Sequence, residues 1–214
     1  MIILYDKEPF PAVEKADEQG LLAIGGKLSP ERLLEAYRSG IFPWFEEGDP
    51  VLWWSPDPRM VLFPKDLKVS KSMKQLFKKS AFKVTYNQNF GEVIHNCSQV
   101  YRKDQEDTWI TPNMISAYMK LHELGHALSV EVWEENVLVG GLYGVYLKEK
   151  QVFCGESMFT KVSNASKYGF ISLVEKLKAE NIKLIDCQMH TKHLESLGAK
   201  EVPREVFLSY LQQD

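Results

Sequence analysis

Three polar side chains, Glu156, Asp186 and Gln188, lie inside apolar runs that are typical of buried strands. Because a buried polar group costs free energy unless it is paired or used, all three are candidate site residues. Asp186 and Gln188 are two residues apart, so on a strand they would point to the same face. The aspartate could then accept a hydrogen bond from the glutamine amide and leave the amide oxygen directed at a substrate amine. A purely structural pair is the alternative.

Glu156 stands between Gly155 and Ser157, with the apolar residues Phe153 and Met158 close by in sequence. A carboxylate in such surroundings could hold a cationic group of a substrate, whereas an ion pair inside the fold is the structural alternative. No serine or cysteine has a recognisable base partner in the sequence, so a covalent intermediate is not indicated.

The segment His122-Glu123-Leu124-Gly125-His126 matches the zinc-peptidase signature, in which two histidines one helical turn apart bind the metal. Three features count against that interpretation. The predicted helix ends at Gly125, and Ser129 and Val132 replace the glycine and histidine of the extended signature. The alternation in residues 129–133 then begins a strand. We therefore expect no metal site and interpret the histidines as residues of a helix end.

Residues 67–91 contain six lysines and no acidic residue. If Ser70 caps a helix here, Lys71, Lys74 and Lys78 fall on one face, with apolar side chains opposite. The net charge of −3 alone argues against nucleic-acid binding, but this local face could contact phosphates. A solvated lysine face is the alternative.

Composition indicates a globular protein. The 214 residues are 44% hydrophobic, which suits one large domain or one domain with a small companion. The start of the chain lacks the pattern of a signal peptide, and no apolar run approaches the roughly 20 residues that a bilayer requires. Three widely spaced cysteines form neither a disulfide framework nor a zinc pattern. We expect a cytoplasmic protein without membrane association.

The elements that must position these residues divide at a proline-rich stretch. Residues 1–58 are expected to form a small N-terminal domain, and residues 59–214 a larger one. In the first, Ser29, Pro30 and Gly40 predict the cap, the first residue and the end of a helix. The aromatic and proline-rich stretches that follow predict ordered loops, because proline removes a backbone donor and fixes φ.

The larger domain predicts a meander of strands, a long helix, a further strand and a short helix. The expected ranges are strands at 127–133, 137–147, 151–159 and 182–188, a helix capped by Ser163 that ends near 179, and a helix at 191–197. The class is α+β. The order matches the N-acetyltransferase-like (GNAT-like) fold, which is an analogy of architecture rather than of activity.

Glycines provide two further signals. Gly140, Gly141 and Gly144 weaken a predicted strand unless a ligand, a crossing helix or tight sheet packing requires close approach to the backbone. Conversely, residues 159–164 lack the glycine-rich turn with which acetyltransferases hold a pyrophosphate. Coenzyme A is therefore not expected, and we expect no cofactor.

Stretches from nearly the whole chain resemble the leucyl/phenylalanyl-tRNA:protein transferases. They include Gly40-Ile41-Phe42-Pro43-Trp44, Trp53-Trp54-Ser55-Pro56-Asp57-Pro58-Arg59, Gly140-Gly141-Leu142-Tyr143-Gly144, Phe153-Cys154-Gly155-Glu156-Ser157-Met158-Phe159 and Leu184-Ile185-Asp186-Cys187-Gln188. The resemblance implies a small N-terminal domain, an acetyltransferase-like domain and a reaction without metal. That reaction would transfer leucine, phenylalanine and, less well, methionine from aminoacyl-tRNA to the N-terminal α-amine of proteins that begin with Arg or Lys. The product would be marked for N-end-rule degradation.

The resemblance also implies residue roles. Trp44 and Trp109 would hold the aminoacyl-adenosine end of the tRNA. Glu156 would bind the cationic side chain of the acceptor, and Gln188, oriented by Asp186, would accept a proton from the attacking amine. The pocket for the donor side chain would be lined by Leu142, Phe153, Met158, Leu173 and Ile185. The acceptor-stem phosphates would contact Lys71, Lys74 and Lys78.

Three hypotheses follow from the sequence: an aminoacyltransferase, a zinc peptidase, and a tRNA-binding module without chemistry. The first alone explains the aromatic stretches, the lysine face and the polar residues of the buried strands together. We therefore predict an aminoacyltransferase. We expect a monomer, although the sequence carries no direct signal of the oligomeric state.

Overall fold

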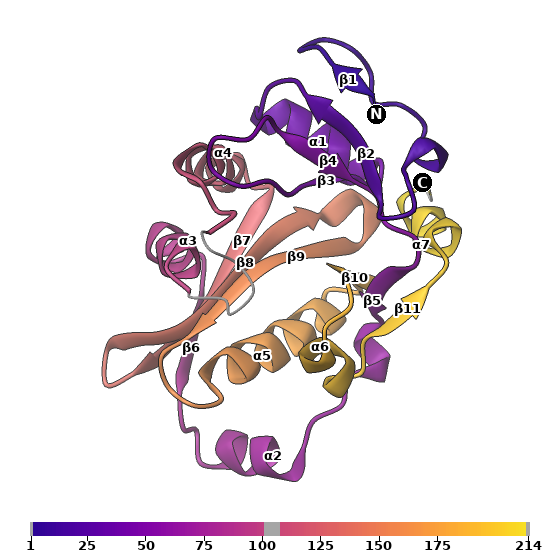
Figure 1. Cartoon of the computed structure of the whole chain (residues 1–214). Coiled ribbons are helices and arrows are strands. Elements are labelled where there is room, and N and C mark those ends of the chain that lie inside the picture. Colours follow the sequence, from indigo (N-terminus) through magenta and orange to yellow (C-terminus); the bar gives the residue numbers. More distant parts are fainter. Residues whose placement is uncertain (1, 101–107, 213–214) are drawn as a thin grey trace.

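The computed structural model of the chain describes residues 2–100 and 108–212, and in them the strands form two separate sheets (Figure 1). The smaller sheet belongs to the N-terminal part of the chain. Its strands are, in spatial order, β1 (Ile3–Leu4), β2 (Leu21–Gly25), β4 (Leu52–Trp54) and β3 (Phe42–Pro43). The larger sheet begins at Arg59.

The N-terminal helix α1 (Pro30–Arg38) confirms the sequence prediction, because the Ser29 side chain accepts a hydrogen bond from the Arg32 backbone N–H at 3.3 Å. Gly40 follows the helix with a φ of 74°, which suits glycine at a helix end. The stretches expected to be loops contain the short strands β3 and β4 instead. Prolines limit the length of these strands to two and three residues.

The larger sheet has seven strands, in the order β11-β5-β10-β9-β8-β7-β6. They are β5 (Arg59–Leu62), β6 (Lys83–Tyr86), β7 (Ala127–Glu134), β8 (Val137–Leu147), β9 (Val152–Thr160), β10 (Leu184–Gln188) and β11 (Lys200–Val202). Strands β7 to β9 form the expected antiparallel meander. The strand β6, which was not predicted, pairs with β7 in antiparallel orientation, and β10 pairs with β9 in parallel. This order of elements, on which the acetyltransferase-like expectation rests, is confirmed.

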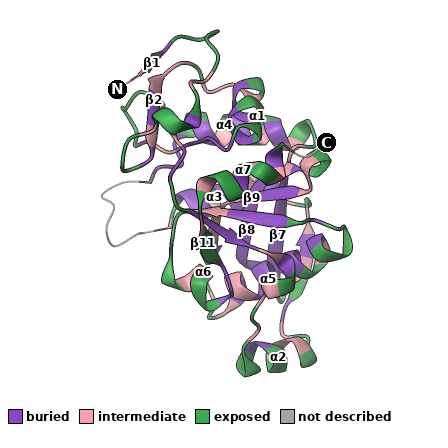
Figure 2. Cartoon of the chain, turned by 90° about the vertical axis from the view of Figure 1, so that its right-hand side faces the viewer, coloured by how far each residue is buried: buried purple, intermediate pink, exposed green. Residues whose placement is uncertain are grey.

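Helices cover both faces of the larger sheet. The helices are α2 (Lys71–Lys78), α3 (Phe90–Ser98), α4 (Pro112–Glu123), α5 (Ala165–Ala179), α6 (Lys192–Ser196) and α7 (Arg204–Leu211). Figure 1 shows α3 and α4 on one side of the meander and α5 on the other, and Figure 2 shows the strands between them as buried. Within the described ranges, no helix is long and apolar enough to span a bilayer.

The start of α5 differs from the prediction. The helix begins at Ala165, and its N-cap position is Asn164, which adopts a left-handed conformation with a φ of 68°. Its side chain makes no capping hydrogen bond, so the prediction that Ser163 caps this helix is wrong. Asparagine tolerates this conformation better than most other residues, which explains its place in the tight turn.

The histidine pair at the end of α4 does not form a metal-binding geometry. The helix ends at Glu123, and Gly125 turns the chain with a φ of 81°. The His122 ring stacks on Phe90, with ring centroids 4.3 Å apart, and its Nδ1 lies 2.8 Å from the Ala127 carbonyl oxygen. Among the described residues no three His, Cys, Asp or Glu side chains are grouped to hold a metal.

The glycines of β8 serve both a crossing helix and tight sheet packing. A Cβ atom on Gly140 would lie 2.7 Å from the Cβ of Ala165 at the start of α5. On Gly144 it would lie 2.2 Å from the carbonyl oxygen of Cys154 and would also meet the Phe153 ring. The close approaches at these two glycines therefore come from the protein itself.

We predict that Gly144→Ala lowers the free energy of unfolding by about 1–3 kcal/mol, because the added methyl group must displace backbone of β9. Gly91→Ala is the matched control, since its Cβ would meet only the flexible Met119 side chain at 3.7 Å. In a helix, that change leaves the stability unchanged or raises it by up to about 1 kcal/mol. Urea unfolding of both variants tests the prediction, and equal effects would contradict it.

Candidate active site

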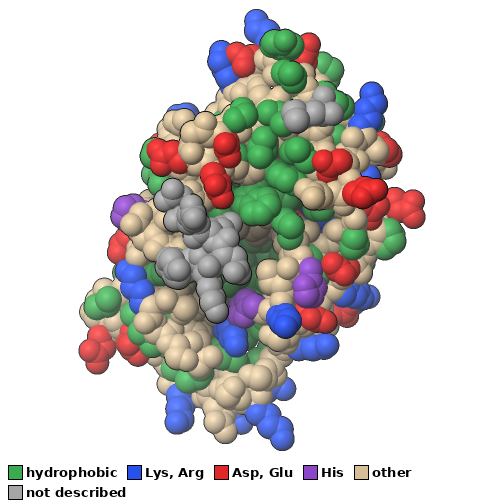
Figure 3. All heavy atoms as spheres, viewed as in Figure 1, with side chains coloured by type: hydrophobic (Ala, Val, Ile, Leu, Met, Phe, Trp, Pro, Cys, Tyr) green, Lys and Arg blue, Asp and Glu red, His purple; other side chains and the backbone are tan. Residues whose placement is uncertain are grey.

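A cavity of about 400 Å³ opens on the face shown in Figure 3, where hydrophobic side chains line a hollow at the centre of the molecule. Residues of β8, β9, β10 and α5 line its walls, and aromatic residues of the segment around β3 line one side. The lining includes six residues that the sequence analysis assigned to the donor: Trp44, Trp109, Leu142, Phe153, Met158 and Ile185. The cavity thus brings together residues from distant parts of the chain.

Leu173 is the exception among the predicted pocket residues, because it is fully buried and does not line the cavity. Phe170, one turn earlier on α5, takes that place. The residue of α5 that lines the cavity is thus Phe170 rather than Leu173. Sequence reasoning also missed Phe42, His193 and Leu194, which line the cavity but lie in short elements without a clear periodicity.

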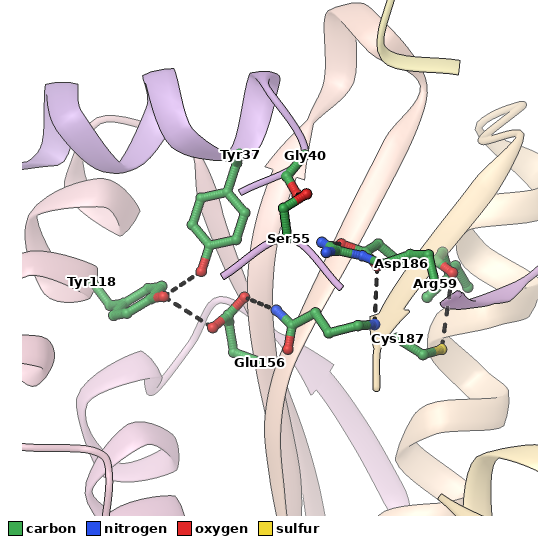
Figure 4. Close-up of polar contacts among 10 residues, drawn as sticks. Tyr37, Gly40, Ser55, Arg59, Tyr118, Glu156, Asp186 and Cys187 are labelled. Carbon is green, nitrogen blue, oxygen red and sulfur yellow. Dashed lines mark hydrogen bonds and ion pairs between the residues drawn. The ribbon is translucent and has the colours of Figure 1, made fainter. Parts of the chain in front are cut away.

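Glu156 lies at the polar end of the cavity and accepts two hydrogen bonds. Its Oε1 accepts from Gln188 Nε2 at 2.9 Å, and its Oε2 accepts from the Tyr118 hydroxyl at 2.9 Å. Tyr118 of α4 also shares a short hydrogen bond with the hydroxyl of Tyr37 from α1 (Figure 4). Neither tyrosine can be recognised as a site residue from the sequence, because nothing in their spacing separates them from ordinary core residues of an amphipathic helix.

Burial raises the pKa of Glu156 to about 7. The nearby tyrosine hydroxyls and the Gln188 amide oppose this shift by stabilising the carboxylate, whereas the charge of Asp186 adds to it. Burial and the nearby Glu156 carboxylate raise the pKa values of Tyr37 and Tyr118 well above their usual range, so both hydroxyls keep their protons. Near neutral pH, Glu156 therefore changes readily between an acid and a carboxylate that can bind a cation.

Asp186 is fully buried beneath the cavity and forms an ion pair with Arg59 of β5. The guanidinium donates from Nε to Oδ1 and from one terminal nitrogen to Oδ2, each at 2.8 Å. The rings of Phe42 and Phe207 lie 4.8 and 4.6 Å from the guanidinium carbon. The residue that holds Asp186 is thus Arg59, whereas the sequence analysis expected the Gln188 amide.

Gln188 is held by both carboxylates, but in a different way from the expected one. Asp186 Oδ1 accepts the backbone N–H of Gln188 at 2.9 Å, and Glu156 accepts its side-chain amide. A register shift between Asp186 and Gln188, together with a φ of 63° at Gln188, breaks the strand alternation. Gln188 consequently lines the cavity while Asp186 stays in the core, so the same-face expectation is wrong.

The lysine face on α2 has the predicted form. Ser70 caps the helix, Lys71, Lys74 and Lys78 are exposed, and Met73 is buried against the core. In Figure 1, α2 lies at the lower end of the molecule, away from the N-terminal sheet. Among the described residues, none forms an ion pair with these three lysines. The lysine face can therefore bind an external anion.

The cavity and its polar end define a class of site. An apolar cavity with an aromatic wall binds an apolar group, and the adjoining Glu156 carboxylate can bind a cation. Hydrogen bonds to two carboxylates fix Gln188. Its side-chain amide can therefore contact a group that lies between the apolar cavity and the Glu156 carboxylate. This arrangement suits an enzyme that brings an apolar substrate and a cationic substrate together in one site.

Comparison with known proteins identifies the family. Residues 61–212 match the family model of the leucyl/phenylalanyl-tRNA protein transferase, and residues 26–57 match the model of its N-terminal domain. The chain belongs to the leucyl/phenylalanyl-tRNA protein transferase family.

Similar proteins cover nearly the whole chain. The leucyl/phenylalanyl-tRNA–protein transferase of Christiangramia forsetii is 60% identical over 99% of this chain and 100% of its own length. The protein of the same name from Shigella dysenteriae is 53% identical over 95% of this chain and 86% of its own. Among solved structures, a GCN5-related N-acetyltransferase from Kribbella flavida is 10% identical, with a TM-score of 0.39 over 78% of this chain and 59% of that chain.

We predict that Asp186→Asn lowers the free energy of unfolding by about 3–5 kcal/mol, because it leaves the buried Arg59 charge without its counter-ion. Glu123→Gln is the control, since it breaks the Lys120–Glu123 pair, whose side chains are 57% and 59% exposed. The loss there should stay below about 1 kcal/mol. Urea unfolding measures both, and an Asp186→Asn variant as stable as the control would show that the pair does not hold the fold.

Proposed function

We propose that the protein transfers leucine, phenylalanine and, less well, methionine from aminoacyl-tRNA to the N-terminal α-amine of proteins that begin with Arg or Lys. The transfer forms a peptide bond and marks the acceptor for N-end-rule degradation. The observation that supports this best is the apolar cavity that ends at the paired Glu156 and Gln188 side chains. Family membership supplies the reaction class.

The donor occupies the cavity in this proposal. Leu142, Phe153, Met158 and Ile185 surround its side chain, and Trp44 and Trp109 contact the terminal adenosine. The walls reject polar side chains by desolvation, but they separate similar apolar ones by only about 1–3 kcal/mol per methylene. Trp54 fixes the Trp44 segment, because its indole N–H donates to the Trp44 carbonyl oxygen at 2.7 Å. Broad specificity for apolar amino acids follows.

The acceptor lies at the polar end. Glu156 uses one lone pair of each oxygen for Gln188 and Tyr118, so it keeps acceptor capacity for the guanidinium or ammonium of the N-terminal residue. Because the Gln188 amide nitrogen faces a carboxylate, its oxygen is directed away from it and accepts a hydrogen bond from the attacking amine. Asp186 acts as a positioning residue, through the backbone N–H of Gln188.

The reaction joins the acceptor α-nitrogen to the ester carbonyl carbon and breaks the bond from that carbon to the 3′ oxygen of the adenosine. One amine proton finally moves to that oxygen. The ester is already activated, so holding the amine and the carbonyl together provides most of the acceleration. Proton transfer assisted by Gln188 adds to it.

Lys71, Lys74 and Lys78 contact acceptor-stem phosphates, which gives affinity that is sensitive to salt but does not read sequence. The two domains divide between residues 58 and 59, in the linker between the two sheets. The protein acts as a monomer in the cytoplasm, where its tRNA substrate is found, and without a cofactor.

We predict arginine-dependent transfer. Radiolabelled leucine should pass from leucyl-tRNA to a peptide with N-terminal arginine, but not to the same peptide with N-terminal alanine, because only the former provides a cation for Glu156. A chelator should have no effect. Scintillation counting of the separated peptides measures the transfer.

The outcomes of this assay separate the three hypotheses. Labelling that the chelator abolishes would favour a metal enzyme, and folded protein that binds tRNA without labelling either peptide would favour a binding module.

Gln188→Ala should lower turnover by about a hundredfold or more if its amide assists proton transfer. Turnover close to the wild-type rate in a folded variant would contradict that role.

We predict that the KM for the arginine peptide falls about tenfold between pH 6 and pH 8. With a pKa of about 7, the ionised fraction of Glu156 rises from about one tenth to about nine tenths over that interval, and only the ionised form attracts the guanidinium. The Glu156→Gln variant should have a higher KM than the wild-type protein, and this KM should lack the pH dependence that comes from the ionisation of Glu156. Because the acceptor amine titrates equally in both enzymes, the ratio of their KM values isolates Glu156, and a ratio that does not change with pH would contradict its role.

A further inference from the structure

The wall of the cavity at α6 carries a polar atom without a partner. His193 lines the cavity, and its Nε2 is buried and makes no hydrogen bond with any residue that the structure describes. Burial, and to a lesser extent the charge of Lys167, lowers the pKa of His193, so the ring is neutral at pH 7. A buried nitrogen of this kind costs free energy unless a ligand supplies the missing partner.

Lys167 adds an uncompensated charge beside this histidine. It lies in the first turn of α5, is half-buried, and forms no ion pair or hydrogen bond within the described part of the chain. The other half-buried amine of α5, that of Lys176, is paired with Glu180. Figure 3 shows lysine or arginine side chains and histidines together on the lower rim of the hollow. Lys167 is not among the residues that line the cavity, but its charge is close enough to act on the His193 ring. A positive charge therefore lies near a neutral hydrogen-bonding ring of the cavity wall.

We propose that Lys167 and His193 bind the phosphodiester that joins the terminal adenosine of the aminoacyl-tRNA to the preceding nucleotide. The inference rests on the proposed function, because that function places an aminoacyl-adenosine in the cavity. The RNA strand must then leave over the rim, and its first anionic group is this phosphodiester. Lys167 supplies the charge, and the Nε2–H of His193 donates to a phosphate oxygen.

The position of the rim agrees with this path. Figures 1 and 2 both show α6 beside α5, with α2 below them. A strand that leaves the cavity between α5 and α6 is therefore directed towards the side of the molecule that carries the lysine face. The phosphodiester contact fixes the position of the ester, whereas the lysines of α2 add affinity without determining where the ester lies.

Two small donors test the contact directly. Leucyl esters of adenosine and of cytidylyl-(3′→5′)-adenosine differ by one nucleotide and its phosphodiester. We expect kcat/KM of the wild-type protein to be about ten- to a hundredfold higher for the dinucleotide ester, as for a hydrogen-bonded charged group. Lys167→Met and His193→Phe should each lose most of this preference, measured as the ratio of kcat/KM for the two esters. Lys167→Arg and His193→Gln, which keep the charge or a donor, should retain part of it.

Matched controls and salt dependence make the assignment specific. Lys178→Met, on the exposed side of α5, and His95→Phe, exposed on α3, should keep the full preference. The slope of log kcat/KM against log salt for the dinucleotide ester should become shallower by about 0.7 in Lys167→Met, because one phosphate contact is lost. In His193→Phe the slope should stay the same, because the ring is neutral.

Equal losses on both esters in folded variants, or a wild-type protein that does not prefer the dinucleotide ester, would overturn this proposal and leave the proposed transfer intact. A wild-type protein that turns over neither ester and does not use leucyl-tRNA would refute the proposed function itself. Equilibrium binding of the two corresponding non-hydrolysable 3′-amides then still tests the phosphodiester contact. Thermal melting of every variant separates loss of contact from loss of fold.

Discussion

The buried ion pair between Arg59 and Asp186 is the constraint on which the site depends. Two charges removed from water need close mutual contact, and each guanidinium–carboxylate bond here is 2.8 Å long. The pair joins β5 to β10, and rings from β3 and α7 cover its guanidinium. Because Asp186 also accepts the backbone N–H of Gln188, the ion pair fixes a residue of the cavity although neither charged group lines the cavity itself.

Glu156 presents the opposite problem, because it must remain able to ionise next to an apolar cavity. Burial favours the protonated acid, whereas donors from Tyr118 and Gln188 favour the carboxylate. The pKa of about 7 is the balance of the two effects. A bound cation would add a third favourable interaction and complete the ionisation. At neutral pH, binding of a cation would therefore raise the ionised fraction of Glu156, which links its charge to occupancy of the site.

Sequence reasoning could predict much of this arrangement, and its failures have physical causes. Helix caps, strand periods and polar residues in apolar runs are local signals, so α1, the meander and the three polar site residues were predictable. Partners across the fold are not local. Arg59 lies 127 residues from Asp186 along the sequence, and the bulge that separates Asp186 from Gln188 contains no glycine that would indicate it. The displacement of Leu173 by Phe170 depends on how α5 rotates against the sheet, which periodicity does not specify.

The N-terminal part of the chain is a component of the site rather than an accessory. Tyr37 comes from α1, and its hydroxyl holds that of Tyr118, which in turn donates to Glu156. Phe42 and Trp44 from the same part form the aromatic side of the cavity, and Phe42 also covers Arg59. Any movement between the two sheets would therefore disturb the cavity, the ionisation of Glu156 and the rings that cover the ion pair together. Because one interface supports the cavity, the ionisation of Glu156 and the ion pair, the small N-terminal sheet must stay docked for the site to exist. The side-chain cap of α1 and the prolines near the aromatic strands restrict the backbone of this part of the chain and so favour a fixed position.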